Sequence, residues 1–247
     1  MWIVLAAAFT VFSADLSAAW IAESDKQSRV IPLPAGKTLS IEVTVGTVRI
    51  EGGDRGDAEI TIERHAPAAT QLARLPITID DTATRASIRV TQLDGGTDPA
   101  LRADVTVRVP RTATIDRVQV LEGRVSVSRF AGTLNADIRR GPIEGKDLSG
   151  TLRLESGIGS VVLTGARLLA DGLLRLRAFN GDVRLTLAER PADARIMALA
   201  LNGAITSDIP LTLRETWGPR WGETTIGKGE PVISLEAVTG AVEIRLP

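Results

Sequence analysis

The stretch VQVLEGRVSVSRFAGTLNADIRRGPIEGKDLSGTLRLESGIGSVV, residues 118–162, carries a glycine at every ninth position: Gly123, Gly132, Gly141, Gly150 and Gly159. Read in steps of 18 residues, the sequence around every second glycine repeats one pattern. The same pattern returns later as LRLRAFNGDVRLTL, IMALALNGAITSDI and ISLEAVTGAVEIRL. A fixed period of this kind, with two turns in each period, is typical of a β-solenoid or β-roll.

The repeats share one register of apolar and polar positions when a glycine of each repeat is set as zero. Positions five and three before the glycine, and two after it, are apolar or small, whereas positions six and four before it are mostly polar. Such alternation places one face of a strand in the core and the other in water. The glycines that share the register are Gly46, Gly123, Gly141, Gly159, Gly181, Gly203 and Gly240. Because Gly46 belongs to the set, residues 38–247 are predicted to form a single all-β domain.

An antiparallel β-meander or sandwich is the alternative to a solenoid. Asn180-Gly181 and Asn202-Gly203 are strong turn dipeptides, and such turns also connect hairpins. The alignment of the columns over many repeats favours the solenoid, with a glycine-turn repeat of 18–22 residues. The spacing widens to 37 residues before Gly240.

The N-terminus resembles a secretory signal. Residues 2–12, WIVLAAAFTVF, form an apolar run too short for a membrane span, which needs about 20 residues. Small residues follow at Ser17, Ala18 and Ala19, so we predict a signal peptide over residues 1–19 and export to the periplasm or cell surface, with no membrane span after cleavage. The alternative is a buried first strand or helix of an intracellular protein. Residues 20–37 are predicted to be an irregular lead-in because of Pro32 and Pro34, and residues 66–75 are the best helical candidate.

The composition argues against several kinds of chemistry. The chain of 247 residues has a net charge of -1, no Cys and one His, and only 3% of its residues are aromatic. Cysteine nucleophiles, thiolate metal sites and disulfides are therefore excluded, and histidine metal clusters and Ser-His triads are not expected. A near-zero charge gives no bulk attraction to nucleic acid. We predict no cofactor, no metal, no nucleic-acid partner and no catalytic residues.

Three segments together resemble the bacterial putative-adhesin family. These are the stretch VTVRVPRTATIDRVQVLEGRVSVSRFAGTLNADIRRGPIEG, the later GDV and GAI turns, and the closing TTIGKGEPVISLEAVTGAVEIRLP. The resemblance covers roughly residues 38–247. It implies an exported, repetitive β-protein and assigns no catalytic residue. Asp follows the key glycine only at Asp182, whereas the family's turns commonly carry Gly-Asp.

Five residues are the candidates for partner binding. Arg117, Arg153 and Arg175 occupy the column six before the glycine and suit an anionic glycan, although opposite charges on a solvated face can also simply pair. Trp217 and Trp221 lie in the insertion before Gly240, where aromatic side chains could stack on sugars or cap the end of the fold. The tripeptide Arg55-Gly56-Asp57 is interpreted as a turn rather than a recognition motif.

The predicted function is that of a non-enzymatic envelope or cell-surface protein, acting as an adhesin-like binding or scaffold module. Its expected partner is an envelope protein or a polysaccharide. The alternative is a carbohydrate-active enzyme on a β-helix scaffold. In that case Asp137 and Glu155, one period apart in the acidic column, would be the paired carboxylates.

Overall fold

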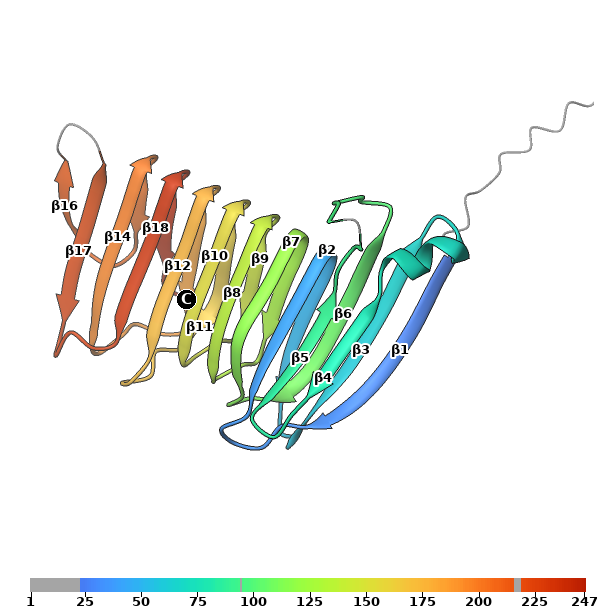
Figure 1. Ribbon diagram of the computed structural model, residues 1–247. Coiled ribbons are helices and arrows are strands. Elements are labelled where there is room, and N and C mark those ends of the chain that lie inside the picture. Colours follow the sequence, from blue (N-terminus) through green and yellow to red (C-terminus); the bar gives the residue numbers. More distant parts are fainter. Residues whose placement is uncertain (1–22, 94, 216–218) are drawn as a thin grey trace, which may run out of the picture.

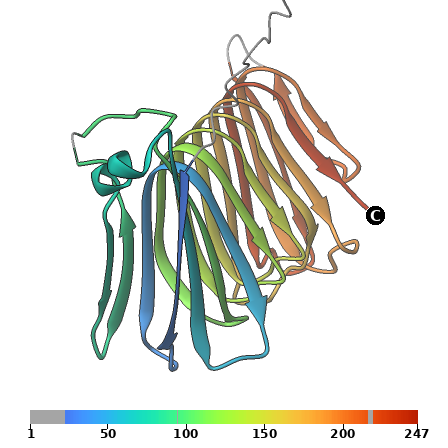
Figure 2. The ribbon, with the colours of Figure 1, turned by 90° about the vertical axis from the view of Figure 1, so that its right-hand side faces the viewer.

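The computed structural model describes residues 23–93, 95–215 and 219–247 as an all-β chain of 19 strands with one short 3₁₀ helix. The strands stand side by side in a long row (Figure 1), and Figure 2 looks onto the end formed by the N-terminal strands. The strands make two faces. Strands β2 (Thr38–Gly53) and β7 (Thr114–Ser128) are long enough to run through both faces, bending at Gly46 and Gly123.

Face 1 contains the strands that precede each key glycine, together with β4 and β5 at one end and β16 and β17 at the other. In their spatial order they are β4 (Ile77–Asp81), β5 (Arg85–Val90), the first halves of β2 and β7, β8 (Thr133–Arg140), β10 (Thr151–Ile158), β12 (Leu173–Asn180), β18 (Val232–Thr239), β14 (Ala194–Asn202), β17 (Arg220–Ile226) and β16 (Thr212–Glu215).

Face 2 contains the strands that follow each key glycine, together with β1, β3 and β6 at the N-terminal end. In their spatial order they are β1 (Glu23–Pro32), β3 (Asp57–Ala66), β6 (Arg102–Pro110), the second halves of β2 and β7, β9 (Ile143–Lys146), β11 (Val161–Ala166), β13 (Val183–Leu187), β19 (Val242–Arg245) and β15 (Ile205–Ser207). We call one face 1 strand and the face 2 strand that follows it a coil.

Neighbouring coils pair in parallel with the predicted register. Leu154 lies opposite Ala136 on one side and Leu176 on the other, and Gly46 lies opposite Gly123. The apolar columns point inward: Val118, Leu154 and Leu176 are all at most 1% exposed. The buried side chains form one continuous cluster from Ile31 to Ile244. The parallel pairs are flanked by antiparallel ones, β1–β3–β6 and β4–β5 at one end and β14–β17–β16 at the other.

The key glycines are needed because the coils approach closely at this corner. A Cβ atom on Gly123 would lie 1.7 Å from the carbonyl oxygen of Gly46, and one on Gly141 would lie 1.8 Å from that of Gly123. Gly123 also has a φ of 144°, which L-residues rarely adopt. The corner is therefore a stack of glycine backbones with no room for a side chain between successive coils.

The C-terminal coil does not lie at the end of the stack. Strand β18 pairs in parallel with β12 on one side and with β14 on the other, and β19 lies likewise between β13 and β15. A Cβ on Gly240 would meet the carbonyl of Gly181, and one on Gly203 would meet that of Gly240. The last coil of the sequence, β18–β19, therefore lies in space between the coil β12–β13 and the coil β14–β15.

The predicted irregular lead-in over residues 20–37 is wrong for its central part. Residues Glu23–Pro32 form strand β1, which pairs antiparallel with β3 along its whole length. Pro32 is compatible with this strand because it is the last residue of β1, which lies at the edge of face 2. The helical candidate contains the 3₁₀ helix η1 (Ala69–Arg74).

Charged side chains close the N-terminal end of the core. Lys37, only 7% exposed, forms an ion pair with Asp81 on β4. Arg64 on β3 pairs with Asp25 on β1 and donates hydrogen bonds to the carbonyl oxygens of Leu72 (3.2 Å) and Leu75 (2.8 Å) around η1. Stacked-repeat proteins need such polar terminal caps because the end of the stack would otherwise expose its apolar interior.

Candidate functional site

The outer side of face 1 carries a groove of about 470 Å³ over strands β7, β8, β10 and β12. Residues that alternate with the buried columns point outward here, because successive side chains of a strand face opposite ways. The side chains that carry the chemistry of the groove come from the columns six and four before the key glycines: Arg117, Gln119, Asn135, Asp137, Arg153, Glu155, Arg175 and Arg177.

The three arginines of the predicted column all line this groove. Parallel pairing places Asn135, Arg153 and Arg175 opposite one another on adjacent strands. Arg117 stands beside Asn135 at an irregularity between β7 and β8, where the register shifts between Ile115 and Val118. Strands are about 4.8 Å apart, so the row repeats its side chains at that interval. The predicted column is therefore in register from Asn135 to Arg175, and Arg117 lines the groove at the irregular end of the row.

Arg153 and Arg175 are exposed and form no ion pair with any residue that the structure describes. Arg117 donates a 2.5 Å hydrogen bond to the side-chain oxygen of Gln119. The sequence allowed the arginines to be neutralised by the neighbouring acidic column, but Glu155 and Glu236 of that column pair with Arg177 instead. Two guanidinium groups therefore stand free at adjacent positions of the row.

Arg177, which lies in the same column as the acidic residues, forms ion pairs with Glu155 and Glu236. Its Nη1 lies 3.7 Å from Oε1 of Glu155, and its Nε lies 3.3 Å from Oε2 of Glu236. The Arg177 guanidinium also sits 4.3 Å from the ring centroid of Phe179, within the range of a cation–π contact. Partial burial raises the pKa of the Asp137 carboxyl, and the positive charge of Arg117 acts in the opposite direction.

An apolar strip lies beside the groove on the same outer face, over β12, β18, β14 and β17. Phe179 and Leu201 are 38% and 39% exposed. The inward residues Ala178, Ala237 and Ala200 are in register, so their outward neighbours lie side by side. The strip consists of Phe179, Val238, Leu199, Leu201 and Trp221. The sequence does contain a signal for this strip. Phe179 and Leu201 each precede an Asn-Gly turn and are apolar at positions whose alternation points them toward water.

The structure describes only one of the two tryptophans that were predicted to bind a partner. Trp221 is half-buried on β17 and lies opposite Leu199, so it extends the apolar strip and is separated from the arginine row by β14 and β18. Trp217 lies outside the described residues, as does the predicted signal peptide, residues 1–19.

Two other hollows carry mixed charge. One, about 480 Å³, lies on face 2 and includes Arg49, Glu51, Glu144 and Lys146. The other, about 530 Å³, lies among loops and includes Glu189, Arg190, Lys228 and Glu230. No cluster of three acidic, histidine or cysteine side chains suited to a metal occurs in the described part of the chain.

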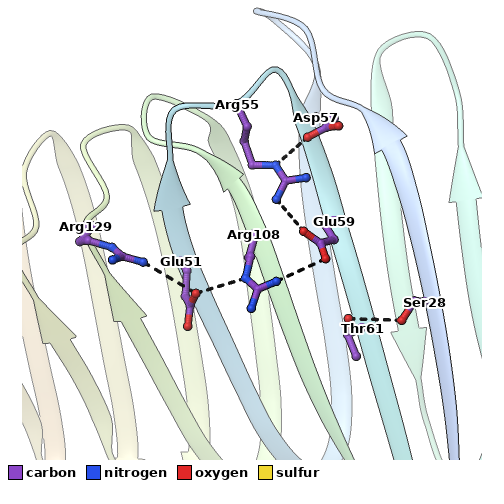
Figure 3. Close-up of polar contacts among 8 residues, drawn as sticks. All are labelled: Ser28, Glu51, Arg55, Asp57, Glu59, Thr61, Arg108 and Arg129. Atoms are coloured by element: carbon purple, nitrogen blue, oxygen red, sulfur yellow. Dashed lines mark hydrogen bonds and ion pairs between the residues drawn. The ribbon is translucent and has the colours of Figure 1, made fainter.

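The Arg55-Gly56-Asp57 tripeptide is part of an ion-pair ladder (Figure 3). Arg55 contacts Asp57 at 2.6 Å and Glu59 at 2.8 Å, so both ends of the tripeptide are engaged with the protein itself. Arg108 links Glu59 to Glu51 at 3.3 Å and 3.4 Å, and Arg129 reaches Glu51 at 3.8 Å. The ladder ties β3, β6 and β2 to the end of β7, which supports the interpretation of the tripeptide as a turn.

The ladder predicts a pH dependence of stability. The hydrogen bond from Arg55, with the positive charge of Arg108, holds the pKa of Glu59 below its ordinary value. A carboxyl whose folded pKa is lowered stabilises the fold above its unfolded-state pKa, and that contribution disappears as the pH falls through the folded pKa. Glu59→Gln should therefore lower the urea midpoint slightly at pH 7, and this difference from wild type should shrink as the pH falls toward pH 3.

Glu189→Gln is the control for this measurement, because Glu189 is exposed and has no ion pair among the described residues. It should leave the urea midpoint unchanged at every pH. A Glu59→Gln chain whose midpoint stays below wild type by the same amount from pH 7 to pH 3 would contradict the prediction.

These features define an all-β protein of stacked coils with an arginine-lined groove and an apolar strip on one outer face. The fold matches a "putative cell adhesion protein" from Clostridium sporogenes ATCC 15579, with a TM-score of 0.53 and 15% identity over 91% of this chain and 100% of that one. A "putative adhesin" from Bacteroides fragilis NCTC 9343 gives a TM-score of 0.45 and 15% identity over 90% and 97%.

The structural neighbours thus carry the name that the sequence motifs predicted. At this identity the first of them establishes a shared fold. No protein-family profile matches the sequence, and no curated protein matches it. Within the described residues, the structure contains no helix with the length and apolar character of a membrane span.

Proposed function

We propose that the chain is a non-enzymatic binding or scaffold module of the bacterial envelope, exported through residues 1–19 and folded over residues 38–247 as a β-solenoid that β1 extends at its N-terminal end. Parallel, in-register pairing of β7 through β12 supports the solenoid assignment. The name of the Clostridium structure of the same fold, a cell adhesion protein, supports the class of function.

The observation that carries the proposal is the outer surface of face 1. It presents the exposed side chains of Phe179 and Leu201, together with Arg153 and Arg175, which form no ion pair with any residue of the described ranges. Surfaces that bind partners combine apolar anchors with polar groups that are not already satisfied within the protein. This binding surface comprises the groove and the apolar strip.

The proposal predicts saturable binding of the purified protein to washed bacterial envelope fragments. Phe179→Ser combined with Leu201→Ser should weaken that binding several-fold, because it removes apolar contact area from the apolar strip. Cosedimentation with the fragments measures it. The control is Val30→Ser combined with Leu93→Ser, which changes two exposed apolar side chains, 57% and 66% exposed, outside the strip. Equal binding by both double variants would place the interaction elsewhere, and the absence of any saturable binding would refute the function.

One observation favours the enzymatic alternative. Asp137 and Glu155 are direct register partners on adjacent strands, and burial raises the pKa of Asp137. A carboxyl pair separated by about 5–5.5 Å with different protonation is the arrangement of a retaining glycosidase. Two observations argue against it. Glu155 already forms an ion pair with Arg177, and the neighbouring Arg153 and Arg175 are exposed to water, so this part of the groove is open to solvent. Release of reducing sugar from polygalacturonate that is lost in both Asp137→Asn and Glu155→Gln would establish the enzyme.

A further inference from the structure

We propose that the groove on the outer side of face 1 binds a linear acidic polysaccharide, a polyuronate, laid across the strands along the row of Arg117, Asn135, Arg153 and Arg175. This proposal rests on the proposed function and names the ligand of its binding surface. Four arginines line the groove against two carboxylates, Asp137 and Glu155, so the groove carries a positive charge although the whole chain has a net charge of -1.

The chemistry of the row suits carboxylates and hydroxyls. A guanidinium presents a planar fork of N–H donors that matches the two oxygens of a carboxylate. Arg153 and Arg175 have no carboxylate partner among the described residues, so a ligand can engage both forks without breaking an ion pair. Asn135 and Gln119, which also line the groove, add amide groups of the kind that hydrogen-bond sugar hydroxyls.

The spacing of the row suits a polymer of sugars better than a peptide. In-register strands repeat their side chains about every 4.8 Å, which is close to the span of one sugar ring in an extended chain. An extended peptide laid across the strands would repeat its same-side residues about every 6.8 Å and would fall out of step with the row. A polyuronate carries one carboxylate on each ring, and in an extended chain with alternating rings the carboxylates on one side recur at every second ring. Those carboxylates reach every second strand, as at Arg117 and Arg153, and the rings between them present hydroxyls to the row.

The apolar strip continues the surface in the direction of the stack. Across the stack from Arg175 the same row continues to Ser234 on β18 and Met197 on β14, whereas Phe179, Val238 and Leu201 lie on these strands four residues nearer the glycine corner. The apolar faces of sugar rings pack against such side chains. A chain that bends from the arginine row toward the glycine corner can therefore remain in contact with the protein over β18 and β14.

The test uses isothermal titration calorimetry to measure how charge-matched double variants of the full chain bind polygalacturonate. Arg153→Gln with Arg175→Gln should weaken binding about tenfold, because each lost fork removes charge-assisted hydrogen bonds. Arg49→Gln with Arg102→Gln removes the same charge from two exposed arginines on face 2 and should leave binding unchanged. Asp137→Asn, which removes a repelling carboxylate from the groove, should strengthen binding. Added salt should weaken it, as expected for exposed charges.

Neutral dextran and a single-stranded polynucleotide serve as comparison ligands and should bind much more weakly than polygalacturonate. Equal affinity for the polynucleotide, or equal losses in the two arginine double variants, would show general polyanion attraction and overturn the inference. Saturable binding to envelope fragments that disappears when the fragments are treated with protease, without binding to polygalacturonate, would also overturn it. That result would indicate a protein partner and would leave the proposed envelope-binding function standing.

Discussion

Gly123→Ala is expected to destabilise the protein by about 3 kcal/mol or more, because the added methyl group meets backbone on the neighbouring coil. Its Cβ would lie 1.7 Å from the carbonyl oxygen and 2.7 Å from the carbonyl carbon of Gly46. Neither atom can move aside without separating β2 from β7, which pair from Thr38 to Glu51. The φ of 144° adds conformational strain. Since small domains are stable by only about 5–15 kcal/mol, this single methyl group removes a large share of the total.

Gly53→Ala is the matched control, measured in the same urea-unfolding experiment. Gly53 ends β2, and no atom lies within 4 Å of the position of an added Cβ. Its free energy of unfolding should change by less than about 1 kcal/mol. If both alanine variants unfold at the same urea concentration, the close stacking of glycines is not what the corner requires.

The local parts of the fold could be predicted from the sequence because they follow from alternation and from turn residues. Val118, Val120 and Val125 were assigned to the core by parity around Gly123, and all three are fully buried. The predicted reason for the glycine was tolerance of positive φ. The structure adds a second reason, the contact with Gly46, which could not be predicted because it depends on which coils are neighbours in space.

Strand β1 was missed because edge strands lack the signal that sequence patterns provide. Nearly all its residues are exposed, so no apolar period marks it, and Pro32 was taken as a barrier to regular structure. A strand that pairs on one side only, as β1 does with β3 among the described strands, satisfies its hydrogen bonds without burying an alternating face.

The arginine row of the candidate site could be predicted, whereas its free charge could not. Parity placed Arg153 and Arg175 in one outward column, as the structure confirms. Which carboxylates neutralise which arginines depends on side-chain geometry, and Arg177 engages both Glu155 and Glu236. The apolar strip was missed because Phe179 and Leu201 belong to different repeats that only become neighbours of Val238 when β18 is inserted between them.

That insertion also could not be predicted. Periodicity orders coils by sequence and places the last one at the end of the stack. The long segment between Gly203 and Gly240 instead holds the hairpin β16–β17. Its strand β17 pairs antiparallel with the edge of β14 that faces away from β18. The chain then returns past β14 and enters between β14 and β12 as β18. Buried residues of β18 and β19, such as Leu235 and Val242, therefore pack between coils on both sides.

Removal of residues 232–247 should consequently disorder residues that are not removed. Deleting the last coil of a simple linear stack exposes one coil end, but here it separates β14, β15, β16 and β17 from the rest of the sheet, because β18 and β19 are the partners that connect them. What remains on face 1 is the three-stranded β14–β17–β16, with β15 left without its partner β19, and these strands lose the neighbouring coil on which they stack. A small set of strands without such packing is at best marginally stable in water. We expect amide hydrogen exchange over residues 194–215 and 219–226 to rise to the rate of an unfolded chain, whereas residues 103–127, far from the deletion, keep their protection and serve as the internal control. Retained protection over residues 194–215 and 219–226 would show that β14 and β17 do not depend on β18 and β19 for their order, and would contradict the prediction.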